Sequence, residues 1–277
     1  MSNISAADVK KLRDMTGAGM MDCKKALKEA EGDFDKAIEI LRKKGEKLAG
    51  KRADRDATEG VVIAKVSDDK TKGVIVKVGC ETDFVAKNDD FVKLAEQFAQ
   101  IALDNMPADT DTLLSTTFEG GMTIGEKITE QIGVIGEKLE LSAYEKLTAE
   151  MVAPYIHMGH KAAVLVALNK ASDDIFTAGR DVAMQVAAMH PIAVDKDGVD
   201  QSTIDKEIEI GKEQARQEGK PEQIIEKIAM GKLNKFFKDN TLLNQQFVKD
   251  NKKSVADYLK SIDNGLTVTD FKHVTLG

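Results

Sequence analysis

The residues whose types could act on another molecule stand together at positions 80–89, Cys-Glu-Thr-Asp-Phe-Val-Ala-Lys-Asn-Asp. They follow an apolar run at residues 74–78, which predicts a buried or half-buried strand, and precede residues 91–99, whose apolar spacing predicts a helix. An exposed Asp83–Phe84 pair at such a junction can present a carboxylate and a hydrophobic wedge to another protein. The alternative is structural, with Asp83 capping the following helix and Phe84 belonging to the core.

The sequence offers no comparable set of residues for enzyme chemistry. It contains neither of the glycine patterns that cradle phosphates, and residues 17–19, Gly-Ala-Gly, are typical of a turn between helices. His157 and His160 stand three residues apart and could share one helical face, but a zinc site needs three or four ligands. Cys23 has two lysine neighbours whose charge can lower a thiol pKa, yet a packed cysteine is the commoner explanation. We therefore expect no covalent catalytic site, no metal and no cofactor.

Composition restricts the class of protein further. The 277 residues are enough for two or more small cores, and the net charge of −7 argues against a general nucleic-acid coat. Only two cysteines are present, which fits a reducing, cytoplasmic location. The longest apolar run, residues 162–168, is far shorter than the roughly 20 residues that a membrane helix needs. The first residues lack the pattern of a signal peptide.

The charge is unevenly distributed along the chain. Residues 1–55 hold 14 Lys and Arg against 10 Asp and Glu, so the excess of acidic residues lies in the remainder. A basic head on an acidic body could orient the chain toward a charged partner, although a solvated helix face is the more ordinary explanation.

The chain divides into three predicted parts. Residues 1–45 have the pattern of three short helices, capped at Ser5, interrupted by glycines and ended by Gly45. Such a bundle is too small to be very stable alone, so we expect a recognition module. A basic linker follows up to residue 55, so residues 1–55 form the first part. The core comprises a first half at 56–150 and a second half at 151–277.

The two core halves show a similar pattern. In the first, residues 61–66 and 72–78 are predicted strands joined by a hairpin loop, and a helix from about residue 88 to 104 ends near Pro107. In the second, a strand at 161–166 precedes a helix that ends at Pro191. The sequence thus predicts an α+β fold with a duplicated unit of antiparallel strands.

The second half contains an insertion at about residues 200–240. Two charged helices separated by Gly219-Lys220-Pro221 are predicted to form an antiparallel helical hairpin, a coiled coil, that projects from the body. A last short helix at 254–259 and a last strand at 266–271 complete the predicted core.

These motifs together resemble a known family. Residues 80–89 and the block at 16–27, Thr-Gly-Ala-Gly-Met-Met-Asp-Cys-Lys-Lys-Ala-Leu, closely resemble bacterial elongation factor Ts. The resemblance covers almost the whole chain, and residues 219–250 resemble the family's helical hairpin and its return to the core. It implies that the three-helix module is similar to ubiquitin-associated (UBA) domains. It also implies a guanine nucleotide exchange factor that acts on elongation factor Tu, bound to GDP or free of nucleotide.

The resemblance further implies which residues do this work. The segment Thr82-Asp83-Phe84-Val85 would dislodge the Mg²⁺ of elongation factor Tu, so that GDP leaves and GTP can bind. Further partner contacts are expected at Val9, Lys24, Lys51, Ile124, Gly125 and His157. The chain itself would bind no nucleotide and no nucleic acid, and the complex could form a homodimer. Many family members continue into a further helical module past the last core strand, and that contact is not expected from this sequence.

Two other functions stay open on the residues alone. An adaptor would use residues 1–45 to bind another protein's tail, or the basic linker to bind ribosomal RNA, and would not need Asp83 and Phe84. A thiol enzyme centred on Cys23 or Cys80 would lose its turnover when both cysteines are replaced by serine.

Overall fold

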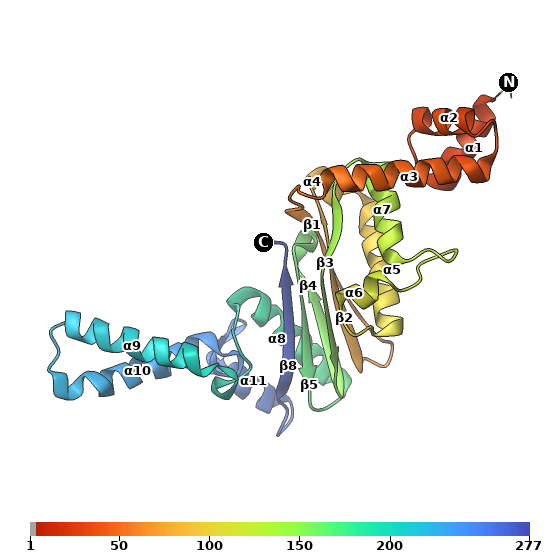
Figure 1. The fold of residues 1–277 in the computed structure, drawn as a ribbon. Helices are drawn as coiled ribbons and strands as arrows, with labels where there is room; N and C mark the ends of the chain where they lie inside the picture. Colours follow the sequence, from red (N-terminus) through yellow and green to blue (C-terminus); the bar gives the residue numbers. More distant parts are fainter. Residues whose placement is uncertain (1–3) are drawn as a thin grey trace.

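The computed structural model describes residues 4–277. It combines α-helices with antiparallel sheets, which confirms the predicted α+β class (Figure 1). A small helical module at the N-terminus, a central double-sheet body and a long helical hairpin lie in succession across the molecule.

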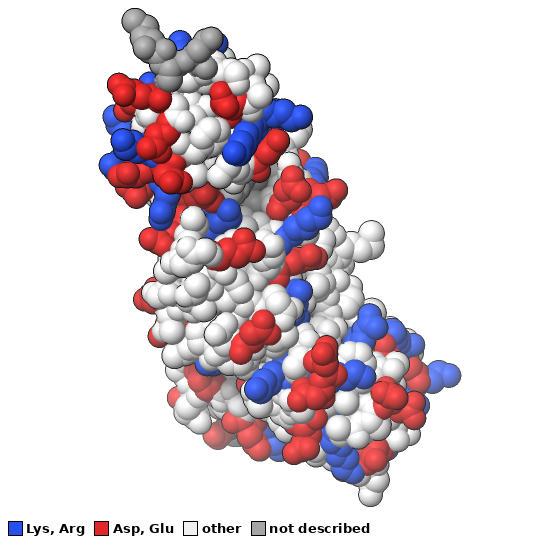
Figure 2. Space-filling model, turned by 90° about the vertical axis from the view of Figure 1, so that its right-hand side faces the viewer, with Lys and Arg blue, Asp and Glu red and all other residues white. Residues whose placement is uncertain are grey.

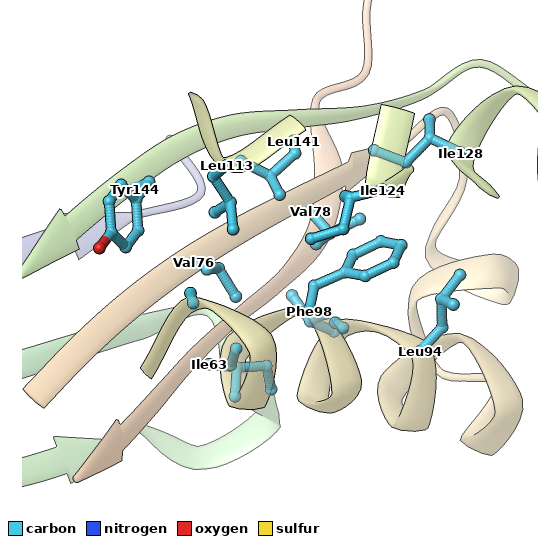
Figure 3. Close-up of a cluster of buried hydrophobic side chains, with 14 of the residues drawn as sticks. Ile63, Val76, Val78, Leu94, Phe98, Leu113, Ile124, Ile128, Leu141 and Tyr144 are labelled. Carbon is cyan, nitrogen blue, oxygen red and sulfur yellow. The ribbon is translucent and has the colours of Figure 1, made fainter. Parts of the chain in front are cut away.

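The first sheet has the strand order β1-β2-β3. Its strands are β1 (Glu59–Val66), β2 (Lys72–Cys80) and β3 (Leu139–Thr148), all antiparallel. The predicted hairpin of β1 and β2 is confirmed, whereas β3 was not predicted. Helices α5 (Asp89–Asn105), α6 (Thr110–Leu114) and α7 (Ile124–Ile135) bury their apolar faces against one side of this sheet. Figure 3 shows side chains from strands and helices converging in that cluster, with Phe98 among them.

The second sheet repeats this arrangement. Its order is β4-β5-β8, with β4 (Met151–Ile156), β5 (Ala162–Leu168) and β8 (Val268–Thr275). Helices α8 (Asp173–Met189) and α11 (Val255–Ile262) cover its outer face. In both sheets the second strand is central, a 17-residue helix follows it, and the third strand pairs on its free side. Both long helices end in a left-handed residue followed by proline, at Met106 and His190.

The two sheets pack face to face. Alternate residues of the central strands, such as Ile75 and Leu165, are fully buried in a cluster that both sheets share. The central strands β2 and β5 are therefore buried on both faces, which explains their continuous apolar runs. The Val152 amide donates to the Lys70 carbonyl at 2.7 Å, so β4 begins beside the β1–β2 loop. Its other end, at Ile156, lies at the same end of the body as the end of β2.

The N-terminal helices are α1 (Ala6–Thr16), α2 (Met20–Glu29) and α3 (Phe34–Arg52). The Ser5 cap of α1 is confirmed, but the prediction that Gly45 ends the third helix is wrong. Gly45 lies inside α3, where it crosses α7 so closely that a Cβ on Gly133 would lie 2.9 Å from the Gly45 Cα. Glycine here permits close packing of two helices, and most of the predicted basic linker is helical.

The hairpin consists of α9 (Gln201–Gln217) and α10 (Glu222–Asn240), which extend away from the body (Figure 1). They pack closely where Gly211 meets Ala229. The chain enters and leaves at adjacent points, since Ala193 forms a parallel bridge with Thr241. Supercoiling of this pair as a coiled coil stays a prediction.

Short elements complete the chain. They are α4 (Asp83–Ala86), β6 (Gln246–Phe247), β7 (Asp250–Ser254) and the 3₁₀ turns Met158–His160, Lys196–Gly198 and Leu242–Asn244. The last predicted helix and strand are confirmed, each extending a few residues further. Within residues 4–277, none of the helices has the length and apolar character to cross a lipid bilayer. Lys and Arg are interspersed with Asp and Glu on the face seen in Figure 2, including the N-terminal module.

Candidate functional site

The segment Thr82–Val85 follows the end of β2 at one end of the double sheet. Thr82 has extended backbone angles and caps the four-residue helix α4, accepting from the Val85 amide at 3.5 Å. Thr82 is therefore the capping residue, and Asp83 is the first residue of the helix rather than its cap.

Phe84 lies on the surface of this short helix, with 83% of its area exposed. The alternative that Phe84 belongs to the core is therefore wrong. Its neighbour Val85 is half-buried and packs against the core of the first sheet. One side of α4 thus packs against the body, and the other side exposes the aromatic ring of Phe84.

Asp83 stands beside Phe84 in an ion pair. Its carboxylate accepts a hydrogen bond from Lys87 Nζ at 2.6 Å, one turn further along the chain. That hydrogen bond and the attraction of the Lys87 charge lower the pKa of Asp83. At neutral pH the site therefore carries a carboxylate that can exchange Lys87 for a partner's cation.

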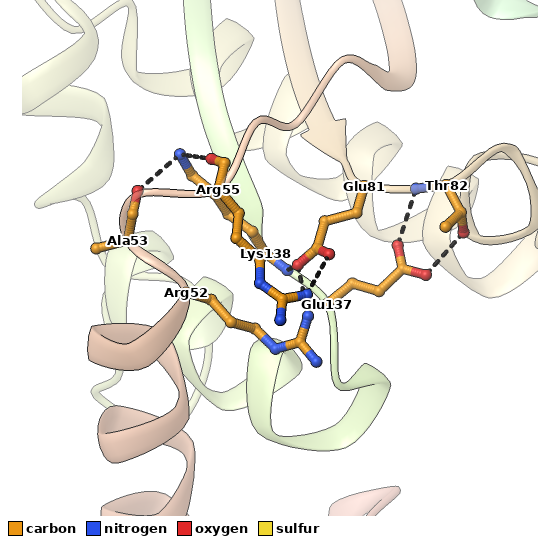
Figure 4. A network of polar contacts seen from close by, with 7 residues as sticks. All are labelled: Arg52, Ala53, Arg55, Glu81, Thr82, Glu137 and Lys138. Atoms are coloured by element: carbon orange, nitrogen blue, oxygen red, sulfur yellow. Dashed lines mark hydrogen bonds and ion pairs between the residues drawn. The ribbon is translucent and has the colours of Figure 1, made fainter.

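Two further carboxylates, those of Glu81 and Glu137, lie beside Thr82 at the start of the segment (Figure 4). Glu137 accepts hydrogen bonds from the Thr82 amide at 3.0 Å and from Thr82 Oγ1 at 2.7 Å. Glu81 accepts from Arg52 at 2.6 Å, from Arg55 at 2.9 Å and from the Lys138 amide at 2.6 Å. Sequence reasoning missed the role of Glu137, because only the fold brings it to a motif 55 residues away.

The loop between β4 and β5 lies at the same end of the body as α4. It contains His157, which is exposed and lies 3.2 Å from the Tyr155 hydroxyl through Nδ1. Met158 beside it has 87% of its area exposed. His157 and His160 do not share a helical face, since Gly159 between them and His160 itself have left-handed backbone angles. The loop and α4 give this end of the molecule two exposed apolar side chains.

The other predicted contact residues differ in exposure. Lys24 on α2 and Lys51 on α3 are exposed, whereas Val9 is 7% exposed in the core of the N-terminal module. Ile124 is fully buried in the first core cluster and Gly125 is half-buried beside it at the start of α7. Any effect of Val9 or Ile124 on a partner would therefore act through packing.

The thiol of Cys80 is poorly suited to attack a substrate. Burial, together with the negative charge of Glu137, raises its pKa to about 12, so it stays protonated at neutral pH. Its Sγ donates to the Thr82 carbonyl at 3.2 Å. Cys23 is also buried, in the N-terminal module. No group of three or more His, Cys, Asp or Glu is arranged to hold a metal within residues 4–277.

Comparison with known proteins decides to which family this arrangement belongs. The family model described as Elongation factor TS matches residues 81–277, which include the α4 segment, β3 of the first sheet and the whole of the second sheet. The chain belongs to the elongation factor Ts family. It is 58% identical to an elongation factor Ts from Christiangramia forsetii over 100% of both chains.

Two further members of the elongation factor Ts family show the same extent of similarity. The chain is 57% identical to one from Amoebophilus asiaticus over 99% of each chain, and 56% identical to one from Flavobacterium psychrophilum over 100% of each. Membership of this family supports a role as a nucleotide exchange factor in translation elongation.

Proposed function

We propose that the chain binds elongation factor Tu in its GDP-bound and nucleotide-free forms and promotes the release of GDP. The segment Thr82–Val85 would disturb the Mg²⁺ and phosphate site of the partner, after which GTP can bind. The observation that carries this proposal is the position of Phe84, 83% exposed beside the Asp83 carboxylate on a helix that rests on the body.

The two side chains have different roles in this proposal. A protruding aromatic ring with a fixed backbone can insert between partner side chains and displace them, as aromatic anchors commonly do at interfaces. Asp83 would fix the direction of the segment by exchanging its ion pair with Lys87 for polar contacts on the partner. Because Mg²⁺ supplies much of the positive charge that holds the phosphates of a bound nucleotide, shifting it weakens that nucleotide's binding.

Support for a wider contact comes from three other exposed residues. His157 lies at the same end of the body as Phe84, while Lys24 and Lys51 present charge on the N-terminal module. We propose that these three touch the partner directly. Val9, Ile124 and Gly125 would support the surfaces from behind, because two of them are buried and the third lies against α6.

Energetically the exchange factor must bind the nucleotide-free partner more tightly than the GDP-bound one. Linkage requires GDP to weaken this binding by the same free energy by which the factor weakens GDP. The factor thus accelerates exchange in both directions, and the concentration of GTP determines the net loading. No covalent step on this chain is involved, and a cytoplasmic location follows from the role in translation.

Release of fluorescent GDP from elongation factor Tu, followed by stopped flow with excess unlabelled GDP, tests the proposal. Wild-type chain should accelerate release strongly. The Asp83→Ala, Phe84→Ala double variant should lose about thirtyfold or more, since removing an interface anchor costs about 2 kcal/mol or more.

A matched control is Ile262→Ala. Ile262 is 39% exposed on α11. The next residue, Asp263, forms an ion pair with Lys170, which follows the end of β5 that is remote from Phe84. This variant should release GDP at the wild-type rate. Unchanged release by the double variant would remove the wedge mechanism, and no acceleration by folded wild-type chain would overturn the proposed function.

A further inference from the structure

The helix that carries Phe84 is too short to hold its own shape. It has four residues, none of them buried, and a single helical turn is marginal in water because nucleation is unfavourable. Its order must therefore come from contacts made by the residues around it. Val85 and Ala86 supply apolar packing against the core of the first sheet, and further contacts beside the helix are polar.

Glu137 provides the first of these polar contacts. It follows Gly136, the left-handed residue that ends α7, so its backbone is fixed by a helix of the core. Its two carboxylate oxygens accept from the amide and from the hydroxyl of Thr82. A two-point contact of this kind fixes both the backbone and the side-chain rotamer of the residue that caps α4.

Glu81 provides the second. The Glu81 side chain is 16% exposed and directly precedes the segment. It binds the guanidinium groups of Arg52, at the end of α3, and of Arg55, three residues further along the chain. Lys138, the residue after Glu137, closes the network by donating from Nζ to the Ala53 and Arg55 carbonyls at 3.1 and 2.7 Å. The last turn of α3, the end of α7 and the segment thus meet in one set of charge-assisted hydrogen bonds (Figure 4).

We propose that Glu81 and Glu137 form a carboxylate clamp, a pair of positioning residues that hold Thr82–Val85 in one conformation and tie it to α3 and α7. The role of Phe84 in this inference rests on the proposed function above. A segment ordered before binding avoids the entropy cost of ordering it in the complex. The clamp also fixes where Phe84 stands relative to α3, which carries the N-terminal module.

The order of the segment can be measured without any partner. The chain contains no tryptophan, so Phe84→Trp creates a single reporter at the tip of α4. Time-resolved anisotropy with the indole excited selectively should show this reporter moving with the whole molecule. Adding Glu137→Ala should introduce a fast local motion, whereas Glu137→Gln, which keeps an acceptor for the Thr82 amide, should restore most of the order.

A neighbouring carboxylate supplies the matched control. Glu140 pairs with Lys138 Nζ at 3.2 Å and has no hydrogen bond to the segment among residues 4–277. Glu140→Ala should leave the anisotropy unchanged. Thr82→Val, which removes the hydroxyl from the other side of the contact, should reproduce the fast motion seen with Glu137→Ala. Circular dichroism melting of each variant checks that the body stays folded.

Exchange kinetics then connect the clamp to Phe84. Glu137→Ala should lower the second-order rate constant for GDP release about tenfold in the wild-type background. It should have little further effect in a Phe84→Ala background, a non-additivity that general loss of stability would not produce. Unchanged anisotropy, or equal losses in both backgrounds, would overturn the clamp. If wild-type chain failed to accelerate GDP release, the proposed function would fail while the anisotropy still tested the clamp.

Discussion

At the scale of single residues, Phe84 exposes its ring to water and belongs to none of the hydrophobic clusters within residues 4–277. Its replacement should therefore leave the fold intact, and the proposed function assigns its effect to binding. We expect Phe84→Ala to change the free energy of unfolding by less than about 0.5 kcal/mol. Urea denaturation measures this, and Phe98→Ala, at a fully buried ring, should cost about 3–5 kcal/mol in the same assay. A large loss from Phe84→Ala would show that the ring supports the fold.

The Glu81 carboxylate makes stability depend on pH. Burial alone would raise its pKa, but hydrogen bonds from the Lys138 amide, Arg55 and Arg52 outweigh burial and lower the pKa to about 2. Because the folded-state pKa lies below the ordinary value of 4.5, the carboxylate stabilises the fold above about pH 4.5. That stabilisation is lost as the pH falls toward about 2.

Wild-type chain should consequently lose more of its free energy of unfolding than Glu81→Gln as the pH falls from about 4.5 to about 3. Urea denaturation at neutral pH and at these two lower values gives the comparison. Glu119→Gln, at an exposed position, is the matched control and should follow the wild-type curve. Parallel curves for wild type and Glu81→Gln would contradict the shifted pKa.

At the scale of elements, the crossing of α3 and α7 depends on two glycines that face each other. A Cβ on Gly133 would lie 2.9 Å from the Gly45 Cα, and neither backbone can move without shifting a helix. We expect Gly133→Ala to destabilise the chain by about 1–3 kcal/mol, because overpacking outweighs the better helix propensity of alanine. Gly50→Ala in α3, where nothing lies within 4 Å, should instead stabilise it by about 0.5–1 kcal/mol. Thermal melting distinguishes the two signs.

The same glycines show why part of the fold could not be predicted. Locally, Gly45 has the signature of a helix end, and the glycines at positions 125 and 133 weaken the helical pattern of α7. Only the contact between the two helices reveals what these residues do. By contrast β1, β2, α5 and α8 were predictable, because their apolar periodicity and capping residues agree with their tertiary environment.

The site was predictable to the same degree. The strand-to-helix junction at residues 80–89 identified the segment, and the structure confirms that Phe84 is exposed. Glu137 carries no local signal, since its partner Thr82 is distant in sequence. Val9 and Ile124 were expected as contacts from the family resemblance, but both are buried. A resemblance gives the positions without telling whether their side chains reach the surface.

At the scale of the whole molecule, the two core halves share one hydrophobic layer. Leu165 on β5 is fully buried among residues of the first sheet, so weakening it should destabilise both sheets together. We expect Leu165→Ala to cost about 2–5 kcal/mol and to increase amide hydrogen exchange in β2 as well as β5. Leu27→Ala, in the separate cluster of the N-terminal module, should increase exchange only in α1 to α3. Loss of protection in β5 alone would show that the halves unfold independently.

The parallel bridge between Ala193 and Thr241 places the two ends of the hairpin region side by side. The hairpin region therefore leaves the body and returns to it at adjacent points, whatever the length of its two helices. The closure entropy of a loop grows only slowly with its length, so this position tolerates large changes in size. A foreign domain, such as a fluorescent protein, can therefore be inserted at this position. The inserted domain would make the chain visible inside a cell and would lie away from the end of the body that carries Phe84.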